Sequence, residues 1–526
     1  MSDRPRFFLT TAIDYPNAKP HIGTAFEKLG ADVQARYRRM EGYEVFFLMG
    51  NDENTVKVAK RAIELGKDPK AYCDEMAGNF KEVWAALNIS FDDFIQTTEL
   101  RHHRCCQKFI RKVYDRGFIY KGEYAGLYCE GCEAFKTSRD LTPAGECPLH
   151  PGKPVSNRSE AGYYFKLSAF GERLLALYDS NPEFIQPESR RNEIISLIST
   201  EGLQDVLISR KGETWGIPIP FDPEYTIYVW FDALLNYITA IGYEDDAERF
   251  AKWWPADLHI IGKDITRFHC ALWPAMLMAA ELPPPKRVFG HGFVQLRNEA
   301  TGEVQKIGKS MGNVIEPIDI ITQFSAEAFR LYFLKECPFP SDGEFSWIRF
   351  REKYNNDLAN KLGNHYSRIV KLVSDYFDAG FPGSGGQSPA AIPGSPNLPE
   401  FVARYRTAVE SLEYDVALRS LWEDLLGPVN KYLDDNAPWK LVKTDKEAAL
   451  PVLFAALAPL RVAAILLKPF LPAGAETIYE SFSFDIPWSE IRFEHALETV
   501  MSEVDLRILA PLIDGKVKPL YPRIAG

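Results

Sequence analysis

Two short polar segments, far apart in the chain, carry side chains that suit phosphate chemistry. His21 and Gly23 follow a run of turn-forming residues, while Lys306 and Lys309 lie three residues apart in a second polar loop. An imidazole, or a hydroxyl such as that of Thr24, donates hydrogen bonds to phosphate oxygens, and ammonium groups balance the charge that gathers there. A His-x-Gly by itself more often marks an ordinary loop. The two segments together indicate a nucleotide site.

A second set of side chains has the spacing of a metal site. Cys129 and Cys132 form one Cys-x-x-ligand pair, and Cys147 and His150 form another after an intervening loop. Each pair places two ligands about one turn apart, and the loop lets both pairs close on one tetrahedral ion. The alternative is four unconnected residues. The spacing favours one structural Zn²⁺ with no open coordination position.

The elements around the first phosphate segment position it. Residues 6–11 and 44–49 are short apolar runs that predict strands, and the apolar spacing over residues 22–40 predicts a helix between them. Strand, helix and strand make a right-handed βαβ unit, whose ligands lie beyond the carboxyl ends of the strands. His21 and Gly23 therefore fall at the helix N-terminus. There, unpaired N–H groups would bind phosphate and glycine would let a flat nucleotide approach.

The remaining chain divides by texture. Short aromatic strands begin after residue 117, sheet patterns return at residues 225–231, 257–264 and 287–291, and the chain is almost wholly helical beyond 325. We predict an α/β fold: a Rossmann-type parallel sheet split by a zinc-bearing insertion, followed by an all-α helical bundle domain. The expected divisions are residues 1–116 and 223–324 for the two halves of the Rossmann-type domain, 117–222 for the insertion, 325–350 for a linking segment and 351–526 for the helical domain.

Composition limits the classes of partner. The chain has 526 residues, of which 46% are hydrophobic, and a formal net charge of -11. This charge argues against a generally basic coat for nucleic acid, so RNA contact would depend on local clusters. Such clusters are Arg36, Arg38 and Arg39, and Arg190 and Arg191. A solvated helix face is the simpler interpretation of each.

No segment predicts export or a membrane span. The amino terminus lacks the charged-then-apolar pattern of a signal peptide. The most apolar run, residues 448–460, is too short for a span and contains Pro451 and Pro459, so it predicts a buried helix pair. Eight cysteines, three of them clustered with a histidine, suit a reducing compartment. We expect a cytoplasmic protein with no membrane partner.

With these motifs the chain resembles the class I aminoacyl-tRNA synthetases, whose paired nucleotide motifs read His-Ile-Gly-His and Lys-Met-Ser-Lys-Ser. Further blocks, in order, make nearly the whole chain similar to methionyl-tRNA synthetases: Thr11-Ala12-Ile13-Asp14-Tyr15, Gly50-Asn51-Asp52-Glu53, Tyr228-Val229-Trp230-Phe231-Asp232-Ala233, Gly262-Lys263-Asp264-Ile265 and Asn436-Ala437-Pro438-Trp439. The resemblance implies a ligase that uses ATP, with Mg²⁺, to join methionine to initiator and elongator methionine tRNA through methionyl-adenylate.

The resemblance also implies a role for each matching residue. Asp52 would hold the methionine ammonium, inside a pocket walled by Ile13, Tyr15, Trp230, Ala233, Tyr237 and His269. ATP would contact His21, Gly23, Thr24, Gly262, Asp264, Lys306 and Lys309, of which His21, Thr24, Lys306 and Lys309 would be catalytic. Asn364, Arg368 and Trp439 would read the anticodon. The simpler alternatives are core packing for Trp230 and Tyr237, and a helix cap with an acidic partner for Trp439 and Arg368.

Several positions depart from the family pattern. Thr24 stands where the first motif has its second histidine, Ile307 and Gly308 replace Met and Ser in the lysine loop, and Asn54 and Thr55 follow Asp52-Glu53 where His and Gly are common. The Thr24 change would leave the helix N-terminus and His21 with a larger share of phosphate binding, and Gly308 would loosen the loop.

These departures keep open a non-catalytic RNA-binding protein that retains the fold. A synthetase for leucine or isoleucine is disfavoured, because an insertion of about a hundred residues leaves little room for an editing domain. The chain ends just after residues 520–524, where the family core stops. We therefore expect no appended module and a monomer.

Overall fold

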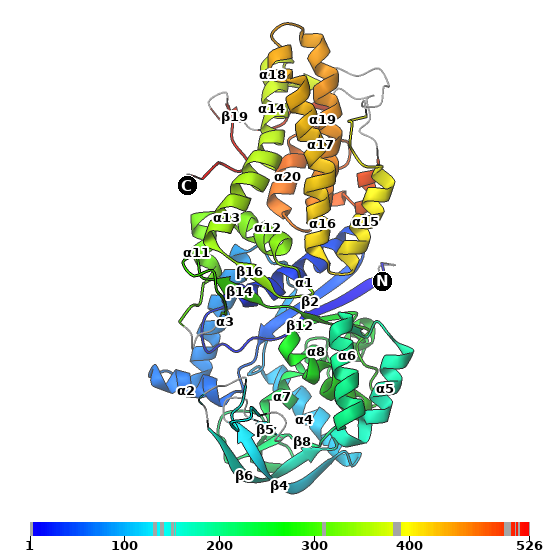
Figure 1. Ribbon diagram of the computed structural model, residues 1–526. Helices are drawn as coiled ribbons and strands as arrows, with labels where there is room; N and C mark the ends of the chain where they lie inside the picture. Colours follow the sequence, from blue (N-terminus) through cyan, green and yellow to red (C-terminus); the bar gives the residue numbers. More distant parts are fainter. Residues whose placement is uncertain are drawn as a thin grey trace.

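A six-stranded parallel sheet forms the centre of the lower half of the molecule (Figure 1). The computed structural model describes residues 4–129, 134–136, 141–148, 152, 154–307, 312–381, 391–498, 506–510, 512–513 and 516–524. The strand order is β3-β2-β1-β12-β13-β7, and every neighbouring pair is parallel. The strands are β1 (Arg6–Thr11), β2 (Glu44–Asn51), β3 (Asp93–Gln96), β7 (Ile185–Gln186), β12 (Leu258–Gly262) and β13 (Val288–His291).

The predicted βαβ unit is confirmed. Helix α1 (Ile22–Met40) connects β1 to the parallel strand β2. It is buried on nearly all sides, because the sheet covers one face and the helical region the other. The hydroxyl of Tyr414 donates to the carbonyl of Gly30 at 2.6 Å, and a Cβ at Gly30 would lie 2.2 Å from the ring of Phe339. Helix α1 is therefore the joint between the two halves of the molecule.

Helices flank the sheet and supply its apolar cover. The flanking helices are α2 (Val56–Glu64), α3 (Pro69–Ala86), α4 (Leu100–Asp115), α5 (Gly171–Ser180), α6 (Glu188–Ser196), α7 (Val229–Ala233), α8 (Asn236–Thr239), α9 (Ala247–Trp253) and α10 (Trp273–Ala279). Phe8 of β1 and Phe46 of β2 pack against Trp253 of α9, and Trp254 packs against Trp273 of α10. Burial of these rings stabilises this layer.

Antiparallel strands form the lower end of the molecule. Strand β4 (Ile119–Cys129) pairs along its whole length with β6 (Val155–Phe165), and β5 (Ala134–Lys136) and β8 (Val206–Leu207) flank this pair. A small second sheet has the order β10-β11-β9, made of β9 (Ser209–Lys211), β10 (Pro218–Ile219) and β11 (Asp222–Ile227). The short strand β7 also falls in the range predicted as the insertion, although it pairs with β13 in the central sheet.

The prediction of a strand over residues 225–231 is wrong in its second half. Strand β11 ends at Ile227, outside the parallel sheet, and helix α7 begins at Val229. Trp230 and Phe231 therefore lie on a helix. Aromatic and β-branched residues favour strands, but burial of the Phe231 ring against Phe109 and Phe165 decides this segment.

The upper half is helical, as predicted (Figure 1). Its helices are α11 (Pro317–Gln323), α12 (Ala326–Glu336), α13 (Trp347–Lys353), α14 (Asn364–Tyr376), α15 (Leu398–Glu410), α16 (Tyr414–Ser420), α17 (Gly427–Asn436), α18 (Pro438–Leu441), α19 (Lys446–Leu467) and α20 (Pro472–Glu480), with π-helical stretches at Tyr354–Gly363 and Leu421–Leu426. Strands β14 (Val294–Arg297), β15 (Val304–Lys306) and β16 (Gly343–Phe345) form a small sheet between the halves. Short strands β17 (Gly380–Phe381), β18 (Leu506–Arg507), β19 (Leu512–Ile513) and β20 (Lys516–Val517) accompany the helices.

The prediction of a buried helix pair at residues 448–460 is wrong. Pro451 and Pro459 both lie inside one continuous helix, α19. Among the described residues, this helix alone is long and apolar enough to cross a membrane, yet 72% of its most apolar window is buried inside the protein. It packs against α14, α17 and α20, so burial in the bundle holds the helix together despite its prolines.

One buried arginine ties the two halves together. Arg330 on α12 is fully buried, and its guanidinium lies 2.7 Å from the carboxylate of Asp32 on α1. It also donates to the carbonyls of Leu87, Pro469 and Phe470 at 3.2, 3.0 and 2.7 Å. Each of the three guanidinium nitrogens therefore has an acceptor, supplied by three segments of chain.

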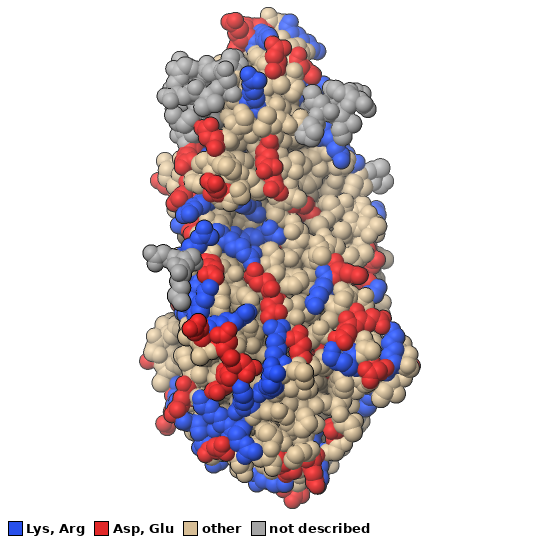
Figure 2. All heavy atoms as spheres, turned by 180° about the vertical axis from the view of Figure 1, so that it is seen from behind, with Lys and Arg blue, Asp and Glu red and all other residues tan. Residues whose placement is uncertain are grey.

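The arginine clusters considered for RNA contact are engaged within the protein. Arg36 pairs with Asp32 at 2.8 Å, and Arg39 pairs with Asp92 at 2.7 Å. Arg190 pairs with Glu193 on its own helix at 2.6 Å. On the face shown in Figure 2, basic side chains lie interleaved with acidic ones, with local gatherings of lysine and arginine. These arginines are therefore ion-paired and partly buried, which fits neither a free basic surface for RNA nor a fully solvated helix face.

Candidate active site

A cavity of about 490 Å³ opens at the carboxyl ends of β1, β2, β12 and β13. This is the position at which parallel α/β sheets bind their ligands. The cavity collects every predicted catalytic, ATP-binding and methionine-binding residue that the structure describes: Ile13, Tyr15, His21, Gly23, Thr24, Asp52, Trp230, Ala233, Tyr237, Gly262, Asp264, His269 and Lys306. Lys309 lies outside the described residues.

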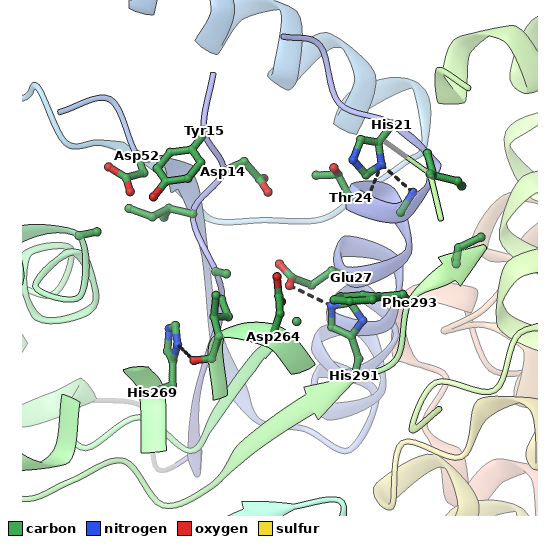
Figure 3. A pocket seen from close by; sticks show the side chains of 18 of the residues that line it. Asp14, Tyr15, His21, Thr24, Glu27, Asp52, Asp264, His269, His291 and Phe293 are labelled. Atoms are coloured by element: carbon green, nitrogen blue, oxygen red, sulfur yellow. Dashed lines mark hydrogen bonds and ion pairs between the residues drawn. The ribbon is translucent and has the colours of Figure 1, made fainter. Parts of the chain in front are cut away.

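His21 is the N-cap of α1 and faces the cavity (Figure 3). Its Nδ1 accepts hydrogen bonds from the N–H groups of Gly23 at 3.1 Å and Thr24 at 3.3 Å. The N–H of Ile22 donates to the carbonyl of Ile315 at 3.0 Å. A backbone N–H only donates, so Nδ1 carries no proton and the neutral ring holds its proton on Nε2.

These contacts correct the expectation that unpaired N–H groups at this helix end bind phosphate. The first three N–H groups of α1 already have acceptors, two of them on the ring of His21. The helix dipole still favours an anion, but direct donors must come from side chains. Gly23 has a further purpose, because a Cβ there would lie 2.9 Å from Cε1 of the capping ring.

One wall of the cavity holds a fixed pair of polar side chains. The hydroxyl of Tyr237 lies 2.7 Å from Nε2 of His269, and Nδ1 of His269 lies 3.2 Å from the carbonyl of Ile265. Burial lowers the pKa of His269 to about 4, so the ring is neutral near pH 7. A carbonyl only accepts, so Nδ1 carries the proton and Tyr237 donates to Nε2. The pair therefore has one defined hydrogen-bond direction.

Aromatic rings complete this wall. Trp230 stacks on Phe268 with ring centroids 4.0 Å apart and planes 4° apart. The ring of Tyr15 meets Trp230 edge-on at 6.4 Å. Such a surface suits an apolar, polarizable side chain, which gains contact area without needing hydrogen-bond partners.

Two buried aspartates lie near each other, one lining the cavity and the other beneath its surface. Asp52 lines the cavity and is 3% exposed, while Asp232 on α7 is fully buried. Burial, followed by the charge of Asp52, raises the pKa of Asp232 well above its ordinary value. Asp232 accepts a hydrogen bond from Asn54 at 3.2 Å. Asn54, which departs from the family pattern, therefore helps to hold the side chain of Asp232 in place.

The cavity also contains a charged network that the sequence analysis missed. Glu27 on α1 lies 3.0 Å from Nε2 of His291 and 2.5 Å from the ammonium of Lys28 (Figure 3 shows the Glu27–His291 pair). Lys28 also lies 3.0 Å from Asp14. Burial is the largest single influence on Glu27 and would raise its pKa, but Lys28 and His291 together outweigh it and lower the pKa of this carboxyl.

Two sequence signals pointed toward this network. Glu27 lies one helical turn after Gly23, and His291 is the last residue of a predicted strand. The rule that ligands gather at carboxyl ends of strands applies to His291 as it does to Asp52.

Gly262 and Asp264 lie where β12 ends, on the same rim as His291. Asp264 points into the cavity in Figure 3. Burial by the cavity walls raises the pKa of its carboxyl. Lys306 lies at the end of β15, and its carbonyl accepts from the side chain of Asn313 at 2.9 Å. The rim of the cavity thus carries both an acidic side chain, Asp264, and a basic one, Lys306.

The three predicted anticodon residues lie on two neighbouring helices far from the cavity. Asn364 and Arg368 share a face of α14, and Trp439 lies on α18. The Arg368 guanidinium lies 4.5 Å from the centroid of the Trp439 indole and 2.8 Å from Asp434. Trp439 is partly exposed. The predicted grouping and the acidic partner of the simpler alternative are therefore both present.

The zinc prediction is only partly within the described residues. Cys129, at the end of β4, and Cys147 are buried. Cys132 and His150 lie outside the described residues. Among the residues that the structure does describe, no group of three or more histidine, cysteine or acidic side chains could hold a metal.

Comparison with known proteins first gives the class. Residues 7–159 and 149–370 match the family described as "tRNA synthetases class I (M)", and residues 384–510 match the "Anticodon binding domain of methionyl tRNA ligase". A Methionine--tRNA ligase of Caldanaerobacter subterraneus subsp. tengcongensis is 43% identical over 93% of this chain and 76% of that relative. One of Thermosynechococcus vestitus is 43% identical over 92% of this chain and 91% of that relative.

Solved structures agree with this result. The chain is similar to Mycobacterium tuberculosis methionyl-tRNA synthetase bound by methionyl-adenylate, with 35% identity, a TM-score of 0.88, and coverage of 98% of this chain and 100% of that chain. The apo form of the same protein gives a TM-score of 0.82 at 33% identity, covering 100% of both chains. The chain belongs to the methionyl-tRNA synthetase family of class I.

Proposed function

We propose a division of labour within the cavity that accounts for the reaction of this family. The enzyme ligates methionine to methionine tRNA at the expense of ATP, through methionyl-adenylate. The observation that carries the division is that the predicted amino-acid and nucleotide residues lie around one cavity. The carboxylate of methionine can therefore meet the α-phosphate of ATP without leaving it.

Methionine occupies the aromatic end in this proposal. Asp52 holds the ammonium group, and Ile13, Tyr15, Trp230, Ala233, Tyr237 and His269 surround the thioether. Because Tyr237 donates its proton to His269, its oxygen faces the ligand as an acceptor only. This wall therefore presents an acceptor without a matching donor, so a polar amino-acid side chain that needs both is not satisfied there. Leucine is shorter and less polarizable than methionine, so it would make less contact with the aromatic wall.

ATP occupies the opposite end. Gly262 and Asp264 receive the ribose, while His21, Thr24, Lys306 and Lys309 contact the phosphates. Nε2–H of His21 and the hydroxyl of Thr24 are the donors, since the N–H groups of α1 are already used. The two lysines stabilise the charge that moves onto the departing pyrophosphate. Mg²⁺ accompanies the phosphates and adds positive charge there.

No side chain acts as a covalent nucleophile in this scheme. The carboxylate oxygen of methionine attacks the α-phosphorus, the bond to the bridging oxygen breaks, and pyrophosphate leaves. The adenylate then passes its acyl group to a hydroxyl of the terminal ribose of tRNA, releasing AMP. Positioning and preorganised charge supply the rate in both steps.

The outer parts of the chain bind tRNA and stabilise the fold. We propose that Asn364, Arg368 and Trp439 read the anticodon, where an indole stacks an unpaired base and the arginine and amide contact its edge. We also propose that the domain boundaries of the chain fall at residues 116, 222, 324 and 350.

Cys129, Cys132, Cys147 and His150 hold one structural Zn²⁺, supported by their spacing and by the burial of Cys129 and Cys147. Metal analysis of the purified protein tests this, and a metal-free folded protein would overturn it.

Methionine-dependent exchange of pyrophosphate into ATP tests the catalytic proposal. We expect exchange with methionine and little with leucine. Exchange that prefers leucine would contradict the assignment of the pocket. A folded protein that binds methionine tRNA without any exchange would support the alternative of a non-catalytic RNA-binding protein. We also propose a cytoplasmic monomer, which light scattering and cell fractionation check.

A further inference from the structure

A β-hairpin connects the ATP end of the cavity to the helical half of the molecule. Strands β14 and β15 are antiparallel, and Gln295 pairs with Lys306 at the open end of the hairpin. Both of these residues line the cavity. The turn of the hairpin, residues 298–303, lies at its other end. The turn and the strand that ends at Lys306 are parts of one hairpin, so a displacement of the turn also displaces Lys306.

The turn has a defined internal structure. The side-chain oxygen of Asn298 accepts from the N–H groups of Ala300 at 2.9 Å and Thr301 at 3.2 Å. Arg297 donates to the carbonyl of Gly302 at 3.0 Å. An Asx turn of this kind fixes the backbone around it. Glu299 lies between the residues joined by these hydrogen bonds, so the backbone from which its side chain projects is held in place.

Glu299 reaches out of the hairpin to the start of helix α13. One carboxylate oxygen accepts from the hydroxyl of Ser346 at 2.9 Å and from the N–H of Ile348 at 3.2 Å. Ser346 is the N-cap of α13 and is 5% exposed. A carboxylate at this helix end satisfies an otherwise unused N–H group and complements the helix dipole. This is a specific contact, made by a group of the favourable charge.

The connection is reinforced and it leads into the anticodon-binding half. Arg297 lies 2.5 Å from the carboxylate of Glu344 on β16, the strand that runs into α13. Helix α13 continues through the π-helical stretch Tyr354–Gly363 into α14 without leaving helical backbone angles. The hairpin that ends in Lys306 is thus attached to the helical segment on which Asn364 and Arg368 lie.

We propose that Glu299 is a positioning residue for Lys306. By fixing the turn of the hairpin on the N-terminus of α13, it holds Lys306 at the phosphate end of the cavity during adenylate formation. This inference rests on the proposed role of Lys306. It assigns to an exposed side chain, which touches neither substrate, an effect on the activation step.

Two substitutions separate the contact from the charge. Glu299→Ala removes both hydrogen bonds, and we expect single-turnover adenylate formation to slow by about three- to tenfold, since small displacements of a catalytic group are costly. Methionine affinity should stay unchanged, because the aromatic end does not contact the hairpin. Glu299→Gln keeps an oxygen that accepts from Ser346 and Ile348, so it should restore most of the rate.

A control and a double mutant make the test decisive. Glu303→Ala removes another exposed carboxylate of the same turn, which accepts only a long hydrogen bond of 3.5 Å from the hydroxyl of Thr301 within the hairpin, and it should leave the rate unchanged. If Glu299 acts through Lys306, adding Glu299→Ala to Lys306→Ala should cause no further loss. Equal rates for Glu299→Ala and wild type, or fully additive losses in the double mutant, would overturn the inference. A Lys306→Ala variant with normal activation would instead overturn the proposed function.

Discussion

The catalytic cavity and the anticodon-binding face solve two recognition problems in opposite ways. The cavity is a partly open recess, and its residues come from the ends of β1, β2, β12 and β13 and from α1 and α7. The proposed anticodon face lies on the surface of α14 and α18, with the guanidinium of Arg368 beside the partly exposed indole of Trp439. In the proposed functions, the cavity surrounds its ligands on several sides, whereas the anticodon face presents the flat indole of Trp439 with the guanidinium of Arg368 beside it.

The difference follows from the ligands. Methionine and ATP are small, so selectivity requires contact on all sides and exclusion of water. An unpaired base presents one flat face and one polar edge, so stacking and a few donors suffice. Burial accordingly shifts the pKa values of Asp232, Asp264 and His269 around the cavity. The two sites should therefore fail independently when they are altered.

Lys306→Ala should give the largest effect. Loss of positive charge at the departing pyrophosphate should slow adenylate formation by about 10²- to 10³-fold. Methionine binding should change little, because the ammonium and thioether contacts lie at the other end. Rapid chemical quench measures the first quantity and equilibrium titration of intrinsic fluorescence the second. A variant with weakened methionine binding and a normal rate would contradict this division of the cavity.

Trp439→Ala should separate the two sites most clearly. We expect aminoacylation of methionine tRNA to fall by about ten- to hundredfold through lost stacking, while methionine-dependent pyrophosphate exchange stays near wild type. Trp439→Phe keeps a ring and should retain most of the activity. Parallel loss of both activities with a lowered melting temperature would show instead that the indole supports the helical core.

Tyr237→Phe should raise the Michaelis constant for methionine by about five- to twentyfold. The change removes the donor to Nε2 of His269 and leaves that buried nitrogen without a partner. Tyr178→Phe is the matched control, because its hydroxyl bonds to the carbonyl of Cys270 in the same layer but outside the cavity lining. The control should lower stability without changing the constant, and an equal rise in both variants would argue against a specific role of Tyr237.

His365→Gln should alter only the pH dependence of stability. Burial lowers the pKa of His365 to about 4, against an ordinary value of 6.5. Between these values the unfolded chain binds the proton and the folded chain does not, so this residue makes stability rise with pH across the window. Removing it should flatten the curve by at most about 1.4 kcal/mol per pH unit. Urea titrations from pH 4 to 6.5 measure this slope, and identical slopes would contradict the prediction.

The sequence predicted the cavity better than the interactions inside it. His21 could be placed from local patterns because it follows a strand and begins a helix, whereas Asp52, Gly262 and Asp264 were assigned from the family resemblance. Strand β12 ends at Gly262, two residues before the end of the predicted strand at residues 257–264. The pair of Glu27 and His291 joins residues that are 264 positions apart. Periodicity carries no information about which side chains meet at that distance. The capping of Gly23 by its own neighbour His21 also depends on a rotamer rather than on a pattern.

The errors in the fold have related causes. Strand β7 has two residues, too few to give any alternation. Residues 225–231 have strong strand propensity, yet the second half folds as α7 because its rings are buried there. In α19 the sequence indicates breaks at Pro451 and Pro459, but packing on several sides maintains one helix. In each case tertiary contacts outweigh local preference.

Arg330 has a consequence for protein engineering. Its guanidinium is neutralised by Asp32 of the catalytic half, and two of its carbonyl acceptors, on Pro469 and Phe470, belong to the helical half. Separating the halves by truncation would leave a buried cation short of acceptors, which is among the costliest defects in a protein interior. A chimera that exchanges anticodon-binding modules between synthetases must therefore transplant the turn after α19 together with the helices, or replace Arg330 and Asp32 as a pair.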